Sequence, residues 1–254
     1  MKGFILAAGL GTRLRPFTLE NPKALVPVGG VPMLERVILR MKDNAINTII
    51  VNIHHFGEKI IEFLKANDNF GLDIRISDER DLLRDTGGGL LHALELLEDD
   101  EPLMLHNVDI LSNAPLKELA ERHLESQSDA TLLVSERDSS RQLIFDNDRN
   151  LSGWHHVGES RYRPEKLGEE VKLNGGILPN GKIERAFSGI HIVNPAAIRR
   201  EMTRQKRTGV FSIIDFYLDS IGSLKVKGVD MPNLEMIDIG KPASLARANE
   251  IQFQ

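Results

Sequence analysis

Residues 2–23 read KGFILAAGLGTRLRPFTLENPK, an apolar segment followed at once by a glycine-rich loop. The apolar part, Lys2 to Ala8, has the length and composition of a buried strand. Gly9 and Gly11 come where this strand ends, and because they lack Cβ atoms, backbone N–H groups there can approach a ligand closely. Loops of this kind surround phosphate oxygens. The stretch therefore predicts a strand that leads into a phosphate-binding loop.

The same loop carries cations and prolines at defined places. Arg13 and Lys23 supply positive charge where charge would move during phosphoryl chemistry. Pro16 and Pro22 stiffen the backbone between them, so the Lys23 ammonium group is presented at a fairly fixed position. We interpret the loop as a reaction site, and a plain glycine-rich turn with surface cations stands as the simpler alternative.

Two commoner glycine-rich motifs do not fit this loop. A dinucleotide-binding turn needs a third glycine three residues after Gly11, where the chain has Leu14. A Walker A loop needs glycine five residues after Gly9, which is Leu14 again. The spacing therefore disfavours both an NAD-dependent oxidoreductase and a P-loop nucleotide hydrolase.

The motif G-x-G-T-R-x-x-P-x-T-x-x-x-P-K is matched in full from Gly9 to Lys23. On this signature the chain resembles the sugar-1-phosphate nucleotidyltransferases, the family that makes nucleotide-diphosphate sugars. Weaker blocks follow in the family's order, and they extend the resemblance over almost the whole chain: TGGG at 86–89, NVD at 107–109, FSGI at 187–190 and IDIG at 237–240.

The resemblance implies a reaction in which a nucleoside triphosphate and a sugar 1-phosphate give a nucleotide-diphosphate sugar and pyrophosphate. The glycine block is similar to that of N-acetylmuramate-1-phosphate uridylyltransferases and of some mannose- or heptose-1-phosphate guanylyltransferases. It favours UTP with N-acetylmuramate 1-phosphate or a related hexose 1-phosphate, and it leaves GTP open. A catalytically silent nucleotide-sugar-binding subunit is the alternative from another class.

Roles for individual residues follow from the matched motifs. Arg13 is expected to stabilise the leaving pyrophosphate and Lys23 the α-phosphoryl group. The run of glycines after Thr86 is expected to let the backbone meet the nucleobase and ribose. The sugar is expected to contact Phe187, Ser188 and Gly189. The expected nucleotide contacts are Leu6, Ala8, Gly9, Gly11, Thr12, Arg13, Asn52, Asp85, Thr86, Gly87, Gly88 and Asn107.

Two aspartates are the candidate metal ligands. Asp109 ends an apolar strand, where a carboxylate is costly unless it faces a cavity, a cation or N–H groups. Asp238 lies in a second short apolar segment. By the resemblance these two hold Mg²⁺, an ion that prefers carboxylates, phosphates and water; turn caps are the alternative. Val108 departs from many relatives, which have glycine there, and its side chain would narrow the substrate space.

Composition limits the other possibilities. The chain has 254 residues, of which 41% are hydrophobic and 27% charged, enough to bury a large core. A net charge of −5 argues against nucleic-acid binding, and the absence of cysteine excludes disulfides and thiolate metal sites. The N-terminus lacks the pattern of a signal peptide, and no apolar run reaches about 18 residues. We expect a cytoplasmic protein without a membrane partner, as a monomer or homodimer.

Strand-like and helix-like segments alternate through the first half. This alternation calls for right-handed crossovers and a doubly wound, mostly parallel sheet, and the resemblance implies a Rossmann-like, glycosyltransferase-A-like α/β fold. Ligands then bind at the carboxyl ends of the strands, where the glycine loop, Asn52, TGGG and Asp109 all come. The predicted strands are 2–8, 48–53, 72–77, 103–107 and 130–135, and the predicted helices are 32–42, 58–66, 89–97 and 115–125.

The second half has a less regular pattern. Between residues 136 and 185 turn residues accumulate, which predicts short strands and loops that form a small sugar-side β extension or an oligomer contact. Two helices at 195–204 and 212–221, a strand at 224–229 and a closing helix from about 243 are predicted after it. We expect one domain over 1–254, with a nucleotide-binding half at about 1–110, a sugar-binding half at about 111–254 and no C-terminal β-helix.

Overall fold

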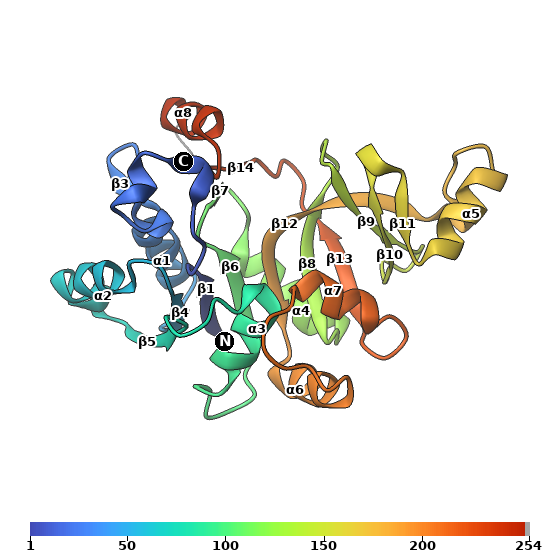
Figure 1. The fold of residues 1–254 in the computed structure, drawn as a ribbon. Helices are drawn as coiled ribbons and strands as arrows, with labels where there is room; N and C mark the ends of the chain where they lie inside the picture. The colour runs from blue at the N-terminus through green and yellow to red at the C-terminus, as the bar shows by residue number, and fades with distance from the viewer. Residues whose placement is uncertain (252–254) are drawn as a thin grey trace.

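The computed structural model describes residues 1–251 and is built around one mixed β-sheet (Figure 1). The strands are β1 (Lys2–Leu6), β2 (Pro27–Val28), β3 (Val31–Pro32), β4 (Thr48–Ile53), β5 (Asp73–Asp78), β6 (Leu103–Asn107), β7 (Ile110–Ser112), β8 (Ala130–Ser135), β9 (Arg141–Phe145), β10 (Leu151–His156), β11 (Arg161–Arg163), β12 (Ile183–Val193), β13 (Val226–Asp230) and β14 (Met236–Asp238). The helices are α1 (Met33–Asp43), α2 (Gly57–Ala66), α3 (Asp85–Leu94), α4 (Leu116–Ser126), α5 (Glu165–Leu173), α6 (Pro195–Arg204), α7 (Ile213–Asp219) and α8 (Pro242–Glu250).

The sheet has the order β11-β10-β9-β12-β6-β1-β4-β5, β8 branches from β12, and β13 pairs with β8. The pairs of β1 with β4 and β6, and of β4 with β5, are parallel. The long strand β12 runs antiparallel to β6, β8 and β9, so it joins the parallel half to the rest. The predicted α/β class with a mostly parallel sheet is therefore confirmed.

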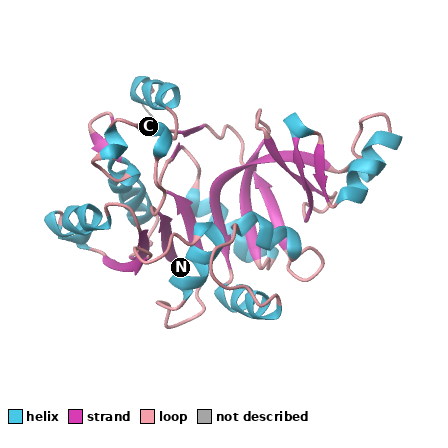
Figure 2. Ribbon diagram, in the orientation of Figure 1, coloured by secondary structure: helices cyan, strands magenta, loops and turns pink. Residues whose placement is uncertain are grey.

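Helices cover both faces of the sheet (Figure 2). Successive side chains of a strand point to opposite faces, and the central strands are buried on both. Phe4 and Leu105 pack in one core with residues of α3, α6 and α7. Their neighbours Ile5 and Met104 pack in the other core with residues of α1, α2 and α4. This two-sided burial explains why strands β1 and β6 are almost continuously apolar.

Two parts of the chain differ from the sequence-based expectation. Helix α3 begins at Asp85, four residues earlier than predicted, so the three glycines 87–89 form its first turns. The segment from residue 136 to 185 contains helix α5 as well as the predicted short strands. With β9, β10 and β11 it forms an arm at one side of the molecule (Figure 1). Among residues 1–251 no helix is long and apolar enough to cross a membrane.

Candidate active site

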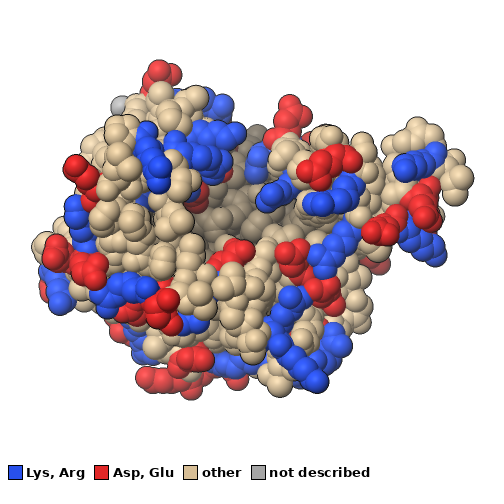
Figure 3. Space-filling model, in the orientation of Figure 1, with Lys and Arg blue, Asp and Glu red and all other residues tan. Residues whose placement is uncertain are grey.

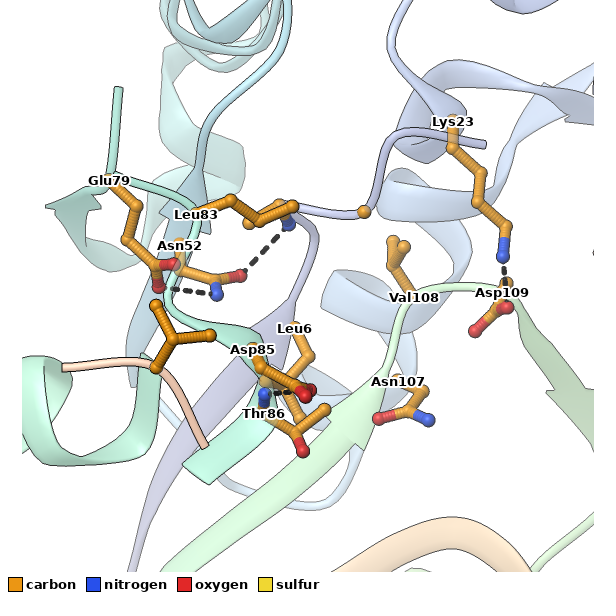
Figure 4. Close-up of a pocket in the computed structure, with 13 residues that line it drawn as sticks. Leu6, Lys23, Asn52, Glu79, Leu83, Asp85, Thr86, Asn107, Val108 and Asp109 are labelled. Atoms are coloured by element: carbon orange, nitrogen blue, oxygen red, sulfur yellow. Dashed lines mark hydrogen bonds and ion pairs between the residues drawn. The ribbon is translucent and has the colours of Figure 1, made fainter. Parts of the chain in front are cut away.

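A cavity of about 440 Å³ opens at the carboxyl ends of β1, β4 and β6, where the sequence predicted a site (Figure 4). In the space-filling view this region is hollowed, with Lys and Arg side chains gathered along its rim (Figure 3). Nine of the predicted residues line the cavity: Leu6, Ala8, Gly9, Lys23, Asn52, Asp85, Thr86, Asn107 and Asp109. Four further residues line it: Val108 of the NVD block, and Glu79, Leu83 and Val210, which no motif had marked. Because Val108 is one of them, its side chain takes space that a glycine would leave free.

Hydrogen bonds to a buried asparagine fix the start of the glycine-rich loop. The side-chain oxygen of Asn52 accepts hydrogen bonds from the backbone N–H groups of Ala7 (2.6 Å) and Ala8 (3.1 Å). Among the described residues, none accepts a hydrogen bond from the N–H groups of residues 9, 10 and 11. These free donors are what binding of an anionic phosphate requires.

Asn52 is in turn held by Glu79. Its side-chain nitrogen donates to Oε1 of Glu79 at 2.8 Å (Figure 4). Oε2 of Glu79 accepts from the backbone N–H of Arg84 at 3.1 Å. Asn52 is 2% and Glu79 0% exposed. The oxygen and one N–H of Asn52 are therefore occupied inside the protein, where they position the loop, and its predicted contact with the nucleotide stays a prediction.

Arg13, Lys23, Asp109 and Asp238 come together at the other end of the loop. Strands β7 and β14 bring the two aspartates together, because Asp238 pairs with Ile110 and the N–H of Ile239 donates to the Asp109 carbonyl at 3.0 Å. The Lys23 ammonium group forms an ion pair with Asp109 (Figure 4). The charged groups of these four residues, which come from separate parts of the sequence, thus lie close together.

Gly240 shows how closely these groups approach one another. A Cβ atom at Gly240 would lie 2.7 Å from Oδ1 of Asp238, 2.8 Å from Nη2 of Arg13 and 3.4 Å from Nζ of Lys23. Two cations and a carboxylate therefore surround one point, and only glycine leaves that point empty. The lining of the cavity does not include Gly11, Thr12, Arg13 or Asp238.

We expect Gly240→Ala to lower kcat at least about tenfold with little change in Tm. The three atoms nearest to the new methyl group are the ends of side chains, so the backbone can stay while the charged groups are displaced by tenths of an ångström or more. Misplaced charges are costly in catalysis. Steady-state kinetics and a thermal melt measure the two effects. Gly158→Ala is the matched control, because a Cβ there comes no nearer than 3.8 Å to His156. Unchanged kcat in Gly240→Ala would mean that the cluster is not catalytic.

The donor set around Asp109 and Asp238 fits a magnesium ion. The described residues hold no group of three or more His, Cys, Asp or Glu side chains that could bind a metal by themselves. Two carboxylates at the paired ends of β7 and β14, with the cavity beside Asp109, match an ion that takes its remaining ligands from phosphates and water. The ion pair with Lys23 places a cation against Asp109.

The glycine run 87–89 has a packing role that the sequence did not indicate. A Cβ at Gly87 would lie 2.5 Å from the ring of Phe211, one at Gly88 would collide with the carbonyl oxygen of Gly209, and one at Gly89 would lie 2.8 Å from Oε1 of Glu79. Gly87 and Gly88 are absent from the cavity lining. The neighbours Phe211, Gly209 and Glu79 therefore require glycine at these positions, and the contact of their backbone with a nucleobase stays a prediction.

Gly9 and Gly88 give a matched pair of substitutions. A Cβ at Gly9 meets nothing within 4 Å, so we expect Gly9→Ala to fold normally and to weaken triphosphate binding where the ligand must approach the loop. Gly88→Ala must push the Gly209 backbone away, at a cost of about 1–3 kcal/mol, which lowers Tm by several degrees. Calorimetric titration and thermal melts separate the two. Triphosphate affinity unchanged in Gly9→Ala would remove the loop from the binding site.

The residues predicted to contact the sugar lie beside the cavity, and some of their groups already form contacts within the protein. Ser188 is buried, and its hydroxyl donates to the carbonyl of Leu133 at 2.7 Å, so it is not a free sugar contact. Gly189 has φ +80°, and a Cβ there would lie 2.8 Å from the side-chain nitrogen of Asn107. Phe187 packs edge-on against His191. These residues shape β12 next to Asn107, which corrects the expectation of a direct Ser188 contact.

Comparison with known proteins decides the family. The nucleotidyl transferase profile matches residues 2–144, more than half of the chain. The chain belongs to the nucleotidyl transferase family. The resemblance stated from the Gly9–Lys23 motif is confirmed, and so is the expectation of an enzyme of this family.

Relatives of this nucleotidyl transferase carry two kinds of name. The N-acetylmuramate alpha-1-phosphate uridylyltransferase of Caulobacter vibrioides is 31% identical over 244 residues, 94% of this chain and 91% of the relative. The mannose-1-phosphate guanyltransferase of Yarrowia lipolytica is 37% identical over 78% of this chain, which spans about half of that relative's length. A Bacillus anthracis structure assigned as a glucose-1-phosphate thymidylyltransferase superposes with a TM-score of 0.78, at 19% identity and over 100% of this chain and 97% of that one, and it shows the shared fold.

Proposed function

We propose that this nucleotidyl transferase joins a nucleoside triphosphate to a sugar 1-phosphate and releases pyrophosphate. The observation that carries the proposal is the arrangement around Gly240. Arg13, Lys23 and Asp238 surround one point, Lys23 contacts Asp109, and the cavity beside them is bordered by a loop with free N–H donors. Such a site can hold several phosphates and stabilise the charge that moves between them.

The reaction is a single in-line displacement. An oxygen of the sugar 1-phosphate attacks the α-phosphorus and the bond to pyrophosphate breaks, so the oxygen of the departing group takes the electron pair. The attacking oxygen is already anionic near neutral pH, so no general base is needed. Lys23 stabilises the α-phosphoryl group and Arg13 the departing pyrophosphate. Asp109 and Asp238 would hold Mg²⁺, which when bound offsets the repulsion between the two phosphates.

The favoured substrates are UTP and N-acetylmuramate 1-phosphate. The support is the Caulobacter relative, which matches this chain from end to end over similar lengths. GTP with mannose or heptose 1-phosphate is the second candidate, because the Yarrowia relative is more identical over a shorter region. A silent binding subunit is less supported, since Arg13, Lys23, Asp109 and Asp238 are all present and close together.

The two halves of the chain have separate proposed tasks. Residues 1–110 supply the glycine loop, Asn52 and Glu79, which border the nucleotide cavity. Residues 111–254 supply β12 and the arm, which adjoin its sugar side. We propose that the whole of 1–254 acts as one catalytic domain.

Pyrophosphate release across a matrix of triphosphates and sugar 1-phosphates tests this proposal. We expect turnover with Mg²⁺ and UTP plus N-acetylmuramate 1-phosphate, and a loss of turnover when Mg²⁺ is chelated. Turnover only with GTP would select the second candidate. Binding of nucleotide sugars without turnover in any combination would contradict the enzymatic function and favour the silent subunit.

A further inference from the structure

Arg137 lies in the loop after β8, next to the part of β12 that adjoins the cavity. Phe187 pairs with Val134, and Ala186 pairs with Ser135, so the loop that follows Ser135 starts beside Phe187. Nη2 of Arg137 donates to the carbonyl of Phe187 at 3.0 Å. This hydrogen bond anchors one edge of the guanidinium group on the sugar side of the site.

The loop that carries Arg137 is braced from within the sheet. The side-chain nitrogen of Gln142, in β9, donates to the Arg137 carbonyl at 3.0 Å. Both the backbone and the side chain of Arg137 therefore have one fixed contact. A guanidinium group held in this way loses less conformational freedom when it binds a ligand.

The remaining donors of Arg137 are free. A guanidinium group has five N–H donors, and one contact is made to Phe187. In the described part of the chain no carboxylate lies within 4.0 Å of it, whereas Arg185 nearby pairs with Glu136 and Asp230. An arginine that is anchored yet lacks a counter-ion is suited to bind an oxyanion.

The anchor of Arg137 on Phe187 connects it to the wall of the cavity. Gly189, two residues after Phe187 on β12, lies against the side chain of Asn107, which lines the cavity. Partial loss of water contact lowers the pKa of Arg137, and the negative charge of Asp238 opposes this shift. Arg137 thus lies on the β8 and β12 side of the site, while Arg13 and Lys23 come from the loop after β1.

We propose that Arg137 binds an oxyanion of the sugar substrate. The inference rests on the proposed function and adds a substrate-binding residue to it. Two oxyanions can occupy this place: the 1-phosphate, which every sugar substrate carries, and a carboxylate such as the lactyl group of N-acetylmuramate. Both accept paired N–H bonds from the planar guanidinium group.

Kinetics of Arg137→Gln test the proposal. We expect KM for the sugar 1-phosphate to rise at least about tenfold, with KM for the triphosphate and Tm unchanged. Arg137→Lys should recover part of the loss, because it keeps the charge without the paired geometry. Arg141→Gln is the matched control, since Arg141 is an exposed arginine four residues further on whose side chain forms no hydrogen bond or ion pair with the described residues.

A pair of sugars distinguishes the two oxyanions. An equal rise in KM for N-acetylmuramate 1-phosphate and N-acetylglucosamine 1-phosphate assigns Arg137 to the 1-phosphate. A rise for the first sugar alone assigns it to the carboxylate. If the wild-type chain turns over and Arg137→Gln leaves KM for every accepted sugar unchanged, the inference is wrong while the proposed function stands. If the wild-type chain turns over no sugar 1-phosphate, the proposed function itself fails.

Discussion

Asp109→Asn and Asp238→Asn are each expected to lower kcat about a hundredfold or more while the chain remains folded. Asparagine keeps the size of the side chain and removes the charge that a hard divalent ion needs. The fold should tolerate both changes. The Asp238 oxygen accepts one hydrogen bond, from the N–H of Gly240 at 2.7 Å, and an amide oxygen can accept it equally well.

The two aspartate variants differ in one useful way. In Asp109→Asn, Lys23 also loses its ion-pair partner, whereas no ion pair of Asp238 is present in the described structure. A loss shared by both variants therefore reports the metal site and not the ion pair. Calorimetric titration with Mg²⁺ should show weaker binding in both, and Asp43→Asn, an exposed aspartate at the end of α1, serves as the control. Full activity in either variant would remove that residue from the metal site.

Lys23→Ala is the second substitution with a large expected effect. We expect kcat to fall on the order of a hundredfold, with a smaller change in triphosphate affinity. The ammonium group lies against Asp109 and within 3.4 Å of the point shared by Asp238 and Arg13, where negative charge redistributes as the sugar oxygen enters and pyrophosphate leaves. A contact that strengthens in the transition state raises kcat more than it tightens substrate binding.

Lys23→Arg separates the position of the charge from the charge alone. The side chain of Lys23 is packed beside Gly11, whose φ is +62° and whose missing Cβ would lie 2.9 Å from the Lys23 Cβ. Since a guanidinium group is larger and planar, we expect only partial recovery of kcat. Rapid-quench and steady-state kinetics measure the rate, and calorimetry measures triphosphate affinity. A higher KM for triphosphate with kcat intact in Lys23→Ala would make Lys23 a ground-state anchor and contradict the catalytic role.

The parts of the site that could be predicted are those that depend on local pattern and strand order. Parallel strands that end at Leu6, Ile53 and Asn107 had to meet at one edge, so the cavity lining from these strands followed from the sequence. The contacts of Glu79 with Asn52 could not be predicted, because nothing in a polar segment marks one glutamate as fully buried.

Long-range packing accounts for most of the remaining differences. Val210 enters the cavity from a segment more than a hundred residues after α3, and no motif pointed to it. The glycines of 87–89 were interpreted by their freedom from side chains, while the neighbours that require this freedom, Gly209 and Phe211, are brought there by the tertiary fold alone. Arg137 lay in a stretch of turn residues, where nothing indicated its hydrogen bond with the Phe187 carbonyl.

Because the start of α3 contacts residues 209–213, these two segments can be exchanged between proteins only together. The N–H groups of Gly87 and Gly88 donate to the Phe211 carbonyl, and the Thr86 hydroxyl oxygen accepts from the N–H of Ile213 at 2.9 Å. Anyone who grafts the start of α3 onto another scaffold must therefore transfer residues 209–213 with it. In natural variation, a larger residue at position 88 should appear only together with a shortened or rerouted 209–211 segment.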